Sequence, residues 1–126
     1  MIPYDDFGGR GPVLHFSHPN AYTPRSFRRF LSLLARRHHV IAAHHRPLWY
    51  LSPGAPGVPG PETFTDWNLI ADDLLRFLDQ ERLEGIIGVG HSLGAVATMK
   101  AALREPERFR SLVLIEPVLL PSAVLD

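Results

Sequence analysis

The sequence predicts an α/β fold in which helices flank a mainly parallel sheet. Short, nearly continuous apolar runs alternate along the chain with longer segments of helical periodicity. Strands covered on both faces of a parallel sheet are typically such unbroken apolar runs. Strict alternation of strands with helices indicates right-handed crossovers that keep the strands parallel.

Four segments are predicted to be strands because each is short, largely apolar and flanked by polar or Gly/Pro residues. The clearest three are followed by a turn or helix signal, and the fourth, at residues 39–43, is weaker. These segments are Val13–Phe16, His39–Ala43, Ile86–Val89 and Leu112–Ile115.

Helices are predicted in the three gaps between these strands. The first follows Thr23 as the N-cap and the second follows Thr65, each with apolar residues at helical spacing. The third, Leu93–Leu103, is rich in alanine and is expected to be buried on several sides. The Pro/Gly-rich segment Ser52–Pro61 is predicted to be a loop.

Composition places the chain among globular proteins. Its 126 residues are 45% hydrophobic, carry no formal net charge and are predicted to form one α/β domain, residues 1–126. The absence of cysteine excludes disulfides and thiolate chemistry. Charge balance, scattered arginines and the lack of a leader or spanning segment predict a cytoplasmic protein without nucleic-acid or membrane partners.

The chemical signal is the pattern G-x-S-x-G at Gly90–Gly94. By chance it arises in about 4% of chains of this length. Here an apolar strand ends directly before the pattern and an alanine-rich helix begins directly after it. A strand, a sharp turn and a helix are the context of a nucleophile elbow, so Ser92 is the predicted nucleophile.

Sterics explain the two glycines of the pattern. An elbow forces the serine into a strained conformation, and residues two before and two after it lie against neighbouring backbone. Gly90 and Gly94 are therefore expected where a side chain would clash. The helix N-terminus presents free amides to a developing oxyanion, and the Leu93 N–H is the predicted first donor.

Three stretches make the chain resemble the α/β-hydrolase superfamily over nearly its whole length. They are VLHFSHP (residues 13–19), GVGHSLGA (88–95) and LVLIEP (112–117). The resemblance implies a second oxyanion N–H from Ser17, with Phe16 as the alternative donor. Two departures from the family pattern are Phe16 in place of glycine and the His-His-Arg-Pro turn at residues 44–47.

A serine at the elbow implies acyl transfer through an acyl-enzyme, with an ester, thioester or amide of a small molecule as substrate. No cofactor and no metal is expected. The histidines near residues 38–45 are not predicted to bind zinc, because neighbouring strand residues point to opposite faces and no further ligand type completes a set. A dinucleotide site is disfavoured, because the glycine spacing at residues 88–94 is one residue too long.

The remaining triad members are not evident. In this fold the order is Ser, acid, His, yet 34 residues follow Ser92 and none is histidine. The chain is therefore expected to be the N-terminal part of the fold, lacking the C-terminal strands and lid, and weakly active or inactive. Glu116 is interpreted as a structural carboxylate, and His91 is predicted to face away from the site.

Two further expectations follow. An incomplete sheet leaves residues 112–115 as an apolar edge strand that invites self-association. The alternative to a hydrolase is a non-catalytic α/β binding or interaction module that keeps the elbow only as a folding feature.

Overall fold

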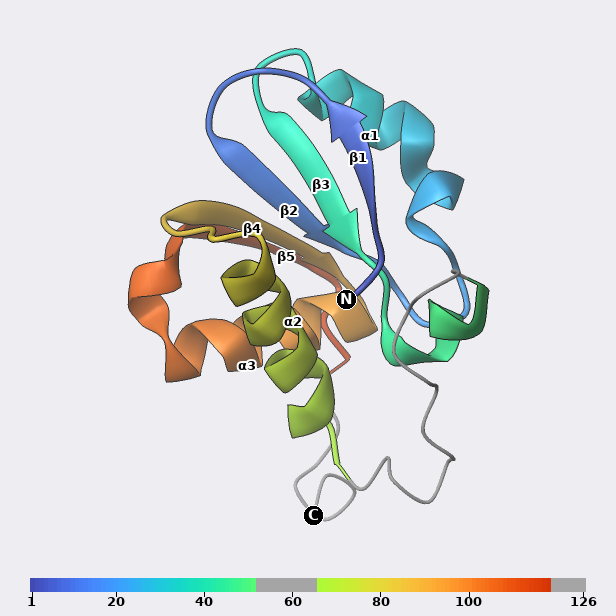
Figure 1. Ribbon diagram of the computed structural model, residues 1–126, viewed down its shortest axis with the longest axis vertical. Helices are drawn as coiled ribbons and strands as arrows, with labels where there is room; N and C mark the ends of the chain where they lie inside the picture. The colour runs from blue at the N-terminus through green and yellow to red at the C-terminus, as the bar shows by residue number, and fades with distance from the viewer. Residues whose placement is uncertain (52–65, 119–126) are drawn as a thin grey trace.

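The computed structural model describes residues 1–51 and 66–118, and its centre is a five-stranded, mostly parallel sheet (Figure 1). The strand order is β1-β3-β2-β4-β5. The strands are β1 (Tyr4–Gly8), β2 (Val13–Ser17), β3 (His39–Ala43), β4 (Ile86–His91) and β5 (Phe109–Ile115). All four predicted strands are confirmed, and the α/β fold class with them.

Strand β1 was not predicted. It runs antiparallel to β3 at the sheet edge, with Asp5 opposite Ala42 and Asp6 opposite Ile41. Adjacent aspartates disfavour a strand in isolation. Partners far along the chain compensate for them: His39 Nε2 lies 3.0 Å from Asp6, and His44 Nε2 lies 2.8 Å from Asp5. The charged side chains also discourage pairing of this edge with another sheet.

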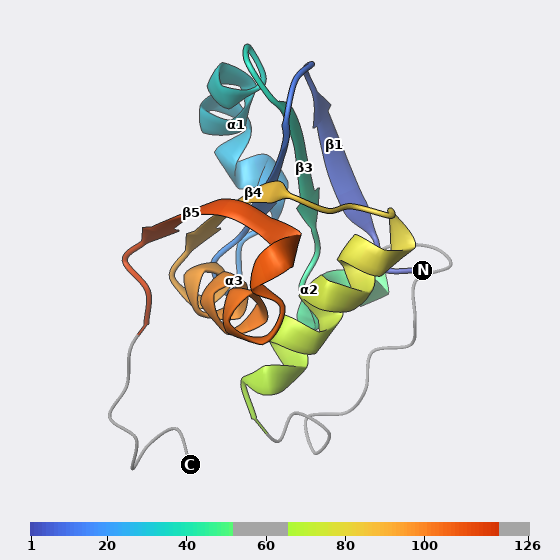
Figure 2. The same ribbon diagram turned by 90° about the vertical axis from the view of Figure 1, so that its left-hand side faces the viewer.

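Three α-helices flank the sheet. They are α1 (Arg28–Leu34), α2 (Asn68–Gln80) and α3 (Leu93–Arg104). Helix α1 lies on one face of the sheet, whereas α2 and α3 lie side by side on the other (Figure 2). None of the helices in the described segments is both long and apolar enough to cross a bilayer.

The predicted start of the first helix is only partly correct. Pro24–Phe27 forms a 3-10 turn before α1, and Thr23 makes no side-chain capping bond. At α2, the Asp66 carboxylate accepts a hydrogen bond of 2.6 Å from the Asn68 N–H. Thr65, after which the second helix was predicted, and the predicted loop at residues 52–61 lie outside the described residues.

The core has two parts, one on each face of the sheet. The part under α1 contains Phe16, Leu31 and Val89. The part under α2 and α3 contains Ile41, Trp49, Phe77 and other residues. Each part contains a residue of β4, Ile86 in one and Val89 in the other, so the strand that leads into the elbow is packed on both faces. The buried residues of the part under α1 are Leu14, Phe16, Leu31, Val40, Ala42 and Val89. Those of the part under α2 and α3 are Ile2, Ile41, Ala43, Trp49, Ala71, Leu74, Phe77, Leu78, Ile86 and Ala101.

Candidate active site at the elbow

Ser92 occupies the single residue between the end of β4 and the start of α3. Its backbone has φ 55° and ψ −116°, a conformation that side-chain-bearing residues rarely adopt. Its N–H donates to the Ile115 carbonyl over 3.0 Å, and its carbonyl accepts from the Ala95 and Val96 amides. The strain is therefore held in place by β5 on one side and by the first turn of α3 on the other.

The steric role predicted for both glycines is confirmed. A Cβ added at Gly94 would lie 1.9 Å from the Ser17 carbonyl oxygen. One added at Gly90 would lie 2.5 Å from the Gly94 oxygen and 2.6 Å from Ala95 Cα. Because the obstructing atoms are backbone, neither contact is relieved by a side-chain rotation. The turn after β2 and the start of α3 are thus pressed together at the elbow.

An opening of about 580 Å³ exposes the Ser92 side chain. Asn20 and Tyr22 line it from the turn after β2, and Glu116, with φ 46°, lines it from the end of β5. His91 also lines it, and its ring packs edge-on against Phe27 at 6.0 Å. His91 therefore borders the site, and the prediction that it faces away is wrong.

Phe16 and Ser17, the predicted second oxyanion donors, lie within β2 and not in the turn that follows it. Both belong to β2, where Phe16 pairs with Val89 and Ser17 with Gly90 of β4, and each is only 1% exposed. The Phe16 ring packs on Phe27 in the core under α1, at 5.2 Å. Neither residue lines the opening at Ser92. The phenylalanine in place of glycine is thus a core residue of a strand, and the turn itself begins later.

Asn20 is the residue of this turn that faces both Ser92 and Leu93. It lines the opening at Ser92 and also a smaller hollow to which Leu93 contributes. Within residues 1–51 and 66–118, the Asn20 and Leu93 amides donate to no backbone oxygen. Asn20 lies three positions after Ser17, and no motif in the sequence singles it out, because the start of this turn depends on where β2 ends.

Two histidines, the buried His18 and the half-buried His45, hold this turn through reciprocal hydrogen bonds. The His18 ring donates from Nδ1 to the Pro19 carbonyl at 2.8 Å and accepts from the His45 N–H at Nε2, at 3.0 Å. The His45 ring returns a bond from Nε2 to the His18 carbonyl at 2.8 Å. The turn after β2 and the turn after β3 are therefore tied to each other, which positions Asn20.

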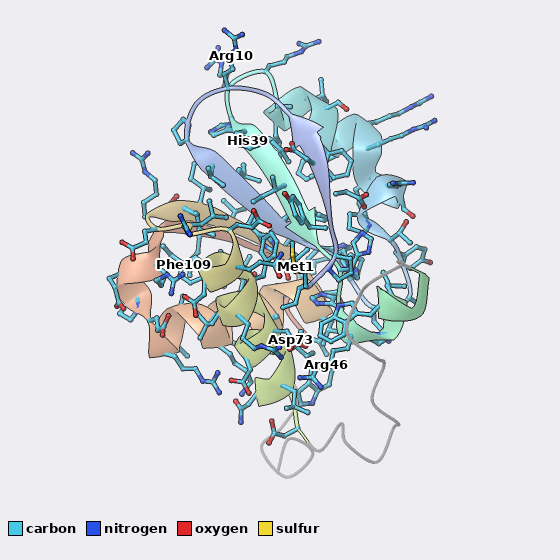
Figure 3. All side chains as sticks on the ribbon, viewed as in Figure 1. Met1, Arg10, His39, Arg46, Asp73 and Phe109 are labelled. Atoms are coloured by element: carbon cyan, nitrogen blue, oxygen red, sulfur yellow. The ribbon has the colours of Figure 1, made fainter. Side chains whose placement is uncertain are left out.

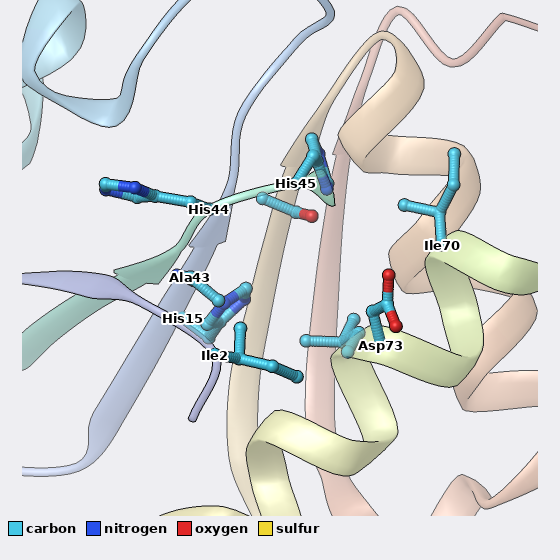
Figure 4. A pocket seen from close by; sticks show the side chains of 9 residues that line it. Ile2, His15, Ala43, His44, His45, Ile70 and Asp73 are labelled. Carbon is cyan, nitrogen blue, oxygen red and sulfur yellow. The ribbon is translucent and has the colours of Figure 1, made fainter. Parts of the chain in front are cut away.

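Burial keeps these histidines neutral. Burial, with the neighbouring His18, lowers the pKa of His15 to about 3, and burial lowers that of His18 to about 4. Burial also holds the pKa of His45 well below its ordinary value. His15 accepts at Nε2 from the Ala43 N–H, while His44 points away from the cluster toward Asp5 (Figure 4). Among the described side chains, no group of three or more is placed to hold a metal ion.

Acidification is expected to destabilise the fold through these histidines. A lowered folded-state pKa means that the unfolded chain binds the proton first, so stability is lost as pH falls from about 6.5 toward 3 to 4. At pH 5, His15 and His18 are each expected to cost about 2 kcal/mol relative to pH 7. Urea unfolding at the two pH values measures this. His18→Asn should reduce the pH dependence, and an unchanged dependence would contradict the assignment.

An ion pair borders the smaller hollow. Arg46 contacts Asp73 of α2 through two bonds, Nε to Oδ2 at 2.5 Å and Nη2 to Oδ1 at 3.0 Å (Figure 3). The Asp73 side chain is 6% exposed, and burial raises its pKa although Arg46 opposes that shift. The Arg46 guanidinium also lies 5.4 Å from the Trp49 ring centre.

Removing only one partner of this pair should be costly. Arg46→Met is expected to destabilise the chain by about 3 kcal/mol, because it removes both hydrogen bonds of a buried carboxylate and leaves only the exposed Arg76, at 3.5 Å, as its partner. The double variant Arg46→Met, Asp73→Leu should recover most of that loss. Arg104→Met, which breaks an exposed pair with Asp72, should cost less than about 1 kcal/mol. Equal losses for Arg46 and Arg104 in urea unfolding would refute this interpretation.

Comparison with known proteins supports the geometric picture. A sequence model of the alpha/beta hydrolase family matches residues 13–126. Strigolactone esterase RMS3 of Pisum sativum is 40% identical over 113 residues, which are 86% of this chain and 39% of that protein.

Solved structures give the same result. A hydrolase from Pseudomonas aeruginosa PA01 superposes with a TM-score of 0.77 at 26% identity, over 96% of this chain and 44% of the other. E-2-(Acetamidomethylene)succinate hydrolase superposes with a TM-score of 0.73 at 30% identity, over 94% and 40%. The chain thus spans less than half the length of each of these proteins.

Proposed function

Because the chain belongs to the α/β-hydrolase family, we propose that Ser92 is the nucleophile of a serine hydrolase. It attacks an ester, thioester or amide carbonyl of a small molecule and forms an acyl-enzyme. The observation that carries the proposal is the strained backbone of Ser92 at an open site, directly before the N-terminus of α3. Strain of this kind persists where the surrounding structure imposes it, and it clusters at functional sites.

The Leu93 and Asn20 amides are the oxyanion donors in this proposal. Leu93 is the first residue of α3, where backbone N–H groups have no partner within the helix. Asn20 replaces the expected Ser17 and Phe16, because those two are buried in β2 and do not line the opening. Two backbone donors converging beside the nucleophile stabilise the negative charge of a tetrahedral intermediate.

A general base for Ser92 is not supplied by the described residues. All seven histidines precede Ser92 in the sequence, and none in the described segments is hydrogen-bonded to its hydroxyl. His15, His18 and His45 are committed to internal hydrogen bonds. We therefore propose that this chain, on its own, acylates slowly, since an unassisted serine is a weak nucleophile.

A fluorophosphonate probe tests the proposal. The expected result is a phosphonylated chain whose adduct maps by peptide mass spectrometry to Ser92. Labelling confined to other residues, or no labelling beyond that of heat-unfolded chain, would instead favour the non-catalytic α/β module. The observation that favours that second candidate is that no histidine of the described segments is hydrogen-bonded to the Ser92 hydroxyl.

The edge strand β5 carries a separate proposal. Leu112 is 38% exposed and Val113 is 50% exposed on this outer strand. We propose that β5 pairs with a further strand, and that two copies associate through it when no other strand is supplied. Light scattering should show a mass that rises with concentration, and Val113→Lys should abolish the rise. A constant monomer mass for the unmodified chain would contradict this.

A further inference from the structure

A second hollow of about 180 Å³ lies next to the elbow. It shares Asn20 with the Ser92 opening, and Leu93 forms part of its wall. The remaining wall comes from the turn after β3 and from the start of α2. The side chains that define it are Pro47, Trp67 and Ile70, with the Arg46–Asp73 pair at its border.

Three of the four polar side chains that line this hollow already have hydrogen-bond partners, and the fourth, Asn20, lies where the hollow meets the Ser92 opening. Arg46 and Asp73 are paired through two hydrogen bonds, and Arg76, whose side chain is exposed, also lies 3.5 Å from Asp73. The His45 ring donates to the His18 carbonyl. An ionic ligand group would have to break one of these partnerships or lie unpaired beside them, which is costly in a partly buried site. An uncharged, apolar group fits without that cost.

The size of the hollow limits the ligand. An apolar cavity of roughly 150 Å³ accommodates one benzene molecule. The hollow at 180 Å³ therefore holds a chain or ring of about six carbons.

Geometry distinguishes the two sides of the site. A carbonyl whose oxygen faces the Asn20 and Leu93 amides has one substituent on each side, toward the hollow and toward the 580 Å³ opening. A leaving group must depart, and water must later reach the acyl-enzyme, so both need the open side. The acyl group, which stays bound through both steps, belongs in the hollow.

We infer that the hollow bounded by Leu93, Trp67 and Ile70 is the acyl subsite, and that it takes uncharged acyl groups of about six carbons. This inference rests on the proposed function, because it assigns a substrate class to the same nucleophile. Specificity then depends on the neutral Arg46–Asp73 border and on Ile70, rather than on a charged anchor.

Binding of uncleaved amides tests this without catalysis. The Ser92→Ala chain is titrated with hexanamide while the two indole N–H signals are followed by NMR. Trp67 lines the hollow, whereas Trp49 is buried and donates to the His44 carbonyl. Hexanamide should shift the Trp67 signal but not the Trp49 signal, with a Kd on the order of 1 mM. Adipamate, of equal length but ending in a carboxylate, should bind at least tenfold more weakly.

Two substitutions alter the hollow in opposite directions. Ile70→Phe fills it and should weaken hexanamide binding about tenfold, whereas Leu33→Phe on the exposed face of α1 should not. Leu93→Ala widens it, keeps the backbone amide and should shift the preference toward octanamide. The second variant keeps the test decisive if Ile70→Phe does not fold.

The outcomes separate this inference from the proposed function. An unmoved Trp67 signal, or equal binding of adipamate and hexanamide, overturns the subsite even if a fluorophosphonate labels Ser92. Selective hexanamide binding without any labelling at Ser92 overturns the acyl assignment, and it supports the hollow as a site for uncharged ligands.

Discussion

Replacing Gly94 with alanine is expected to destabilise the chain by more than about 4 kcal/mol, which approaches the whole stability of a small domain. The added Cβ would lie 1.9 Å from the Ser17 oxygen and 2.7 Å from the His18 oxygen. Since both are backbone atoms, α3 must move away from the turn after β2. That movement would also separate Leu93 from Asn20. Urea unfolding and thermal melting measure the loss.

Gly85→Ala is the matched control. Gly85 has φ +59°, and a Cβ there would meet no atom within 4 Å. The cost should be limited to that of a left-handed backbone, about 1 kcal/mol. If the two alanine variants were equally stable, the close approach of α3 to β2 would not be a determinant of this fold.

Ser92→Ala is expected to remove all specific fluorophosphonate labelling, because it deletes the hydroxyl of the strained residue directly before α3. Any stoichiometric release of p-nitrophenol from an activated ester should disappear with it. The fold should be little affected, since Ser92 holds the elbow through its backbone N–H and carbonyl. Intact-protein mass spectrometry follows the adduct, and urea unfolding checks the stability of the variant.

Ser111→Ala is the corresponding control, because Ser111 is an exposed serine on β5 that pairs with Ile87 and lies away from the elbow. It should label as fully as the unmodified chain. Persistence of the adduct in Ser92→Ala would assign the reactivity to another residue and remove the basis for the proposed nucleophile.

Several elements could be predicted because their causes are local. The strands around residues 13–16, 39–43, 86–89 and 112–115 are apolar runs whose burial on both faces is encoded in the runs themselves. Strand β1 could not be predicted in this way. Its aspartates are compensated by His39 and His44, which lie more than thirty positions away.

The site divides along the same line. The elbow at Ser92 could be predicted from consecutive residues, because an apolar strand, the G-x-S-x-G pattern and an alanine-rich helix follow one another directly. The proposal places the second oxyanion donor at Asn20 and not at Ser17, because Ser17 is paired with Gly90 inside β2 and the extent of β2 depends on that pairing with β4. His91 lies two positions after Val89 in β4, so strand alternation places it with Val89 on the α1 side of the sheet, where its ring packs against Phe27 and borders the opening.

The amino-acid sequence by itself determined the fold class and the elbow, since the apolar runs and the G-x-S-x-G pattern are made of consecutive residues. The pattern also predicted glycine at positions 90 and 94, although the atom that Gly94 must avoid, the Ser17 oxygen, is brought there by tertiary packing. Only the tertiary structure decided which groups meet across the chain: Asn20 beside Leu93, His18 with His45, and Arg46 with Asp73. The latter two pairs join positions 27 residues apart. Such pairings depend on strand register and on where each helix packs against the sheet, which no short stretch of sequence specifies.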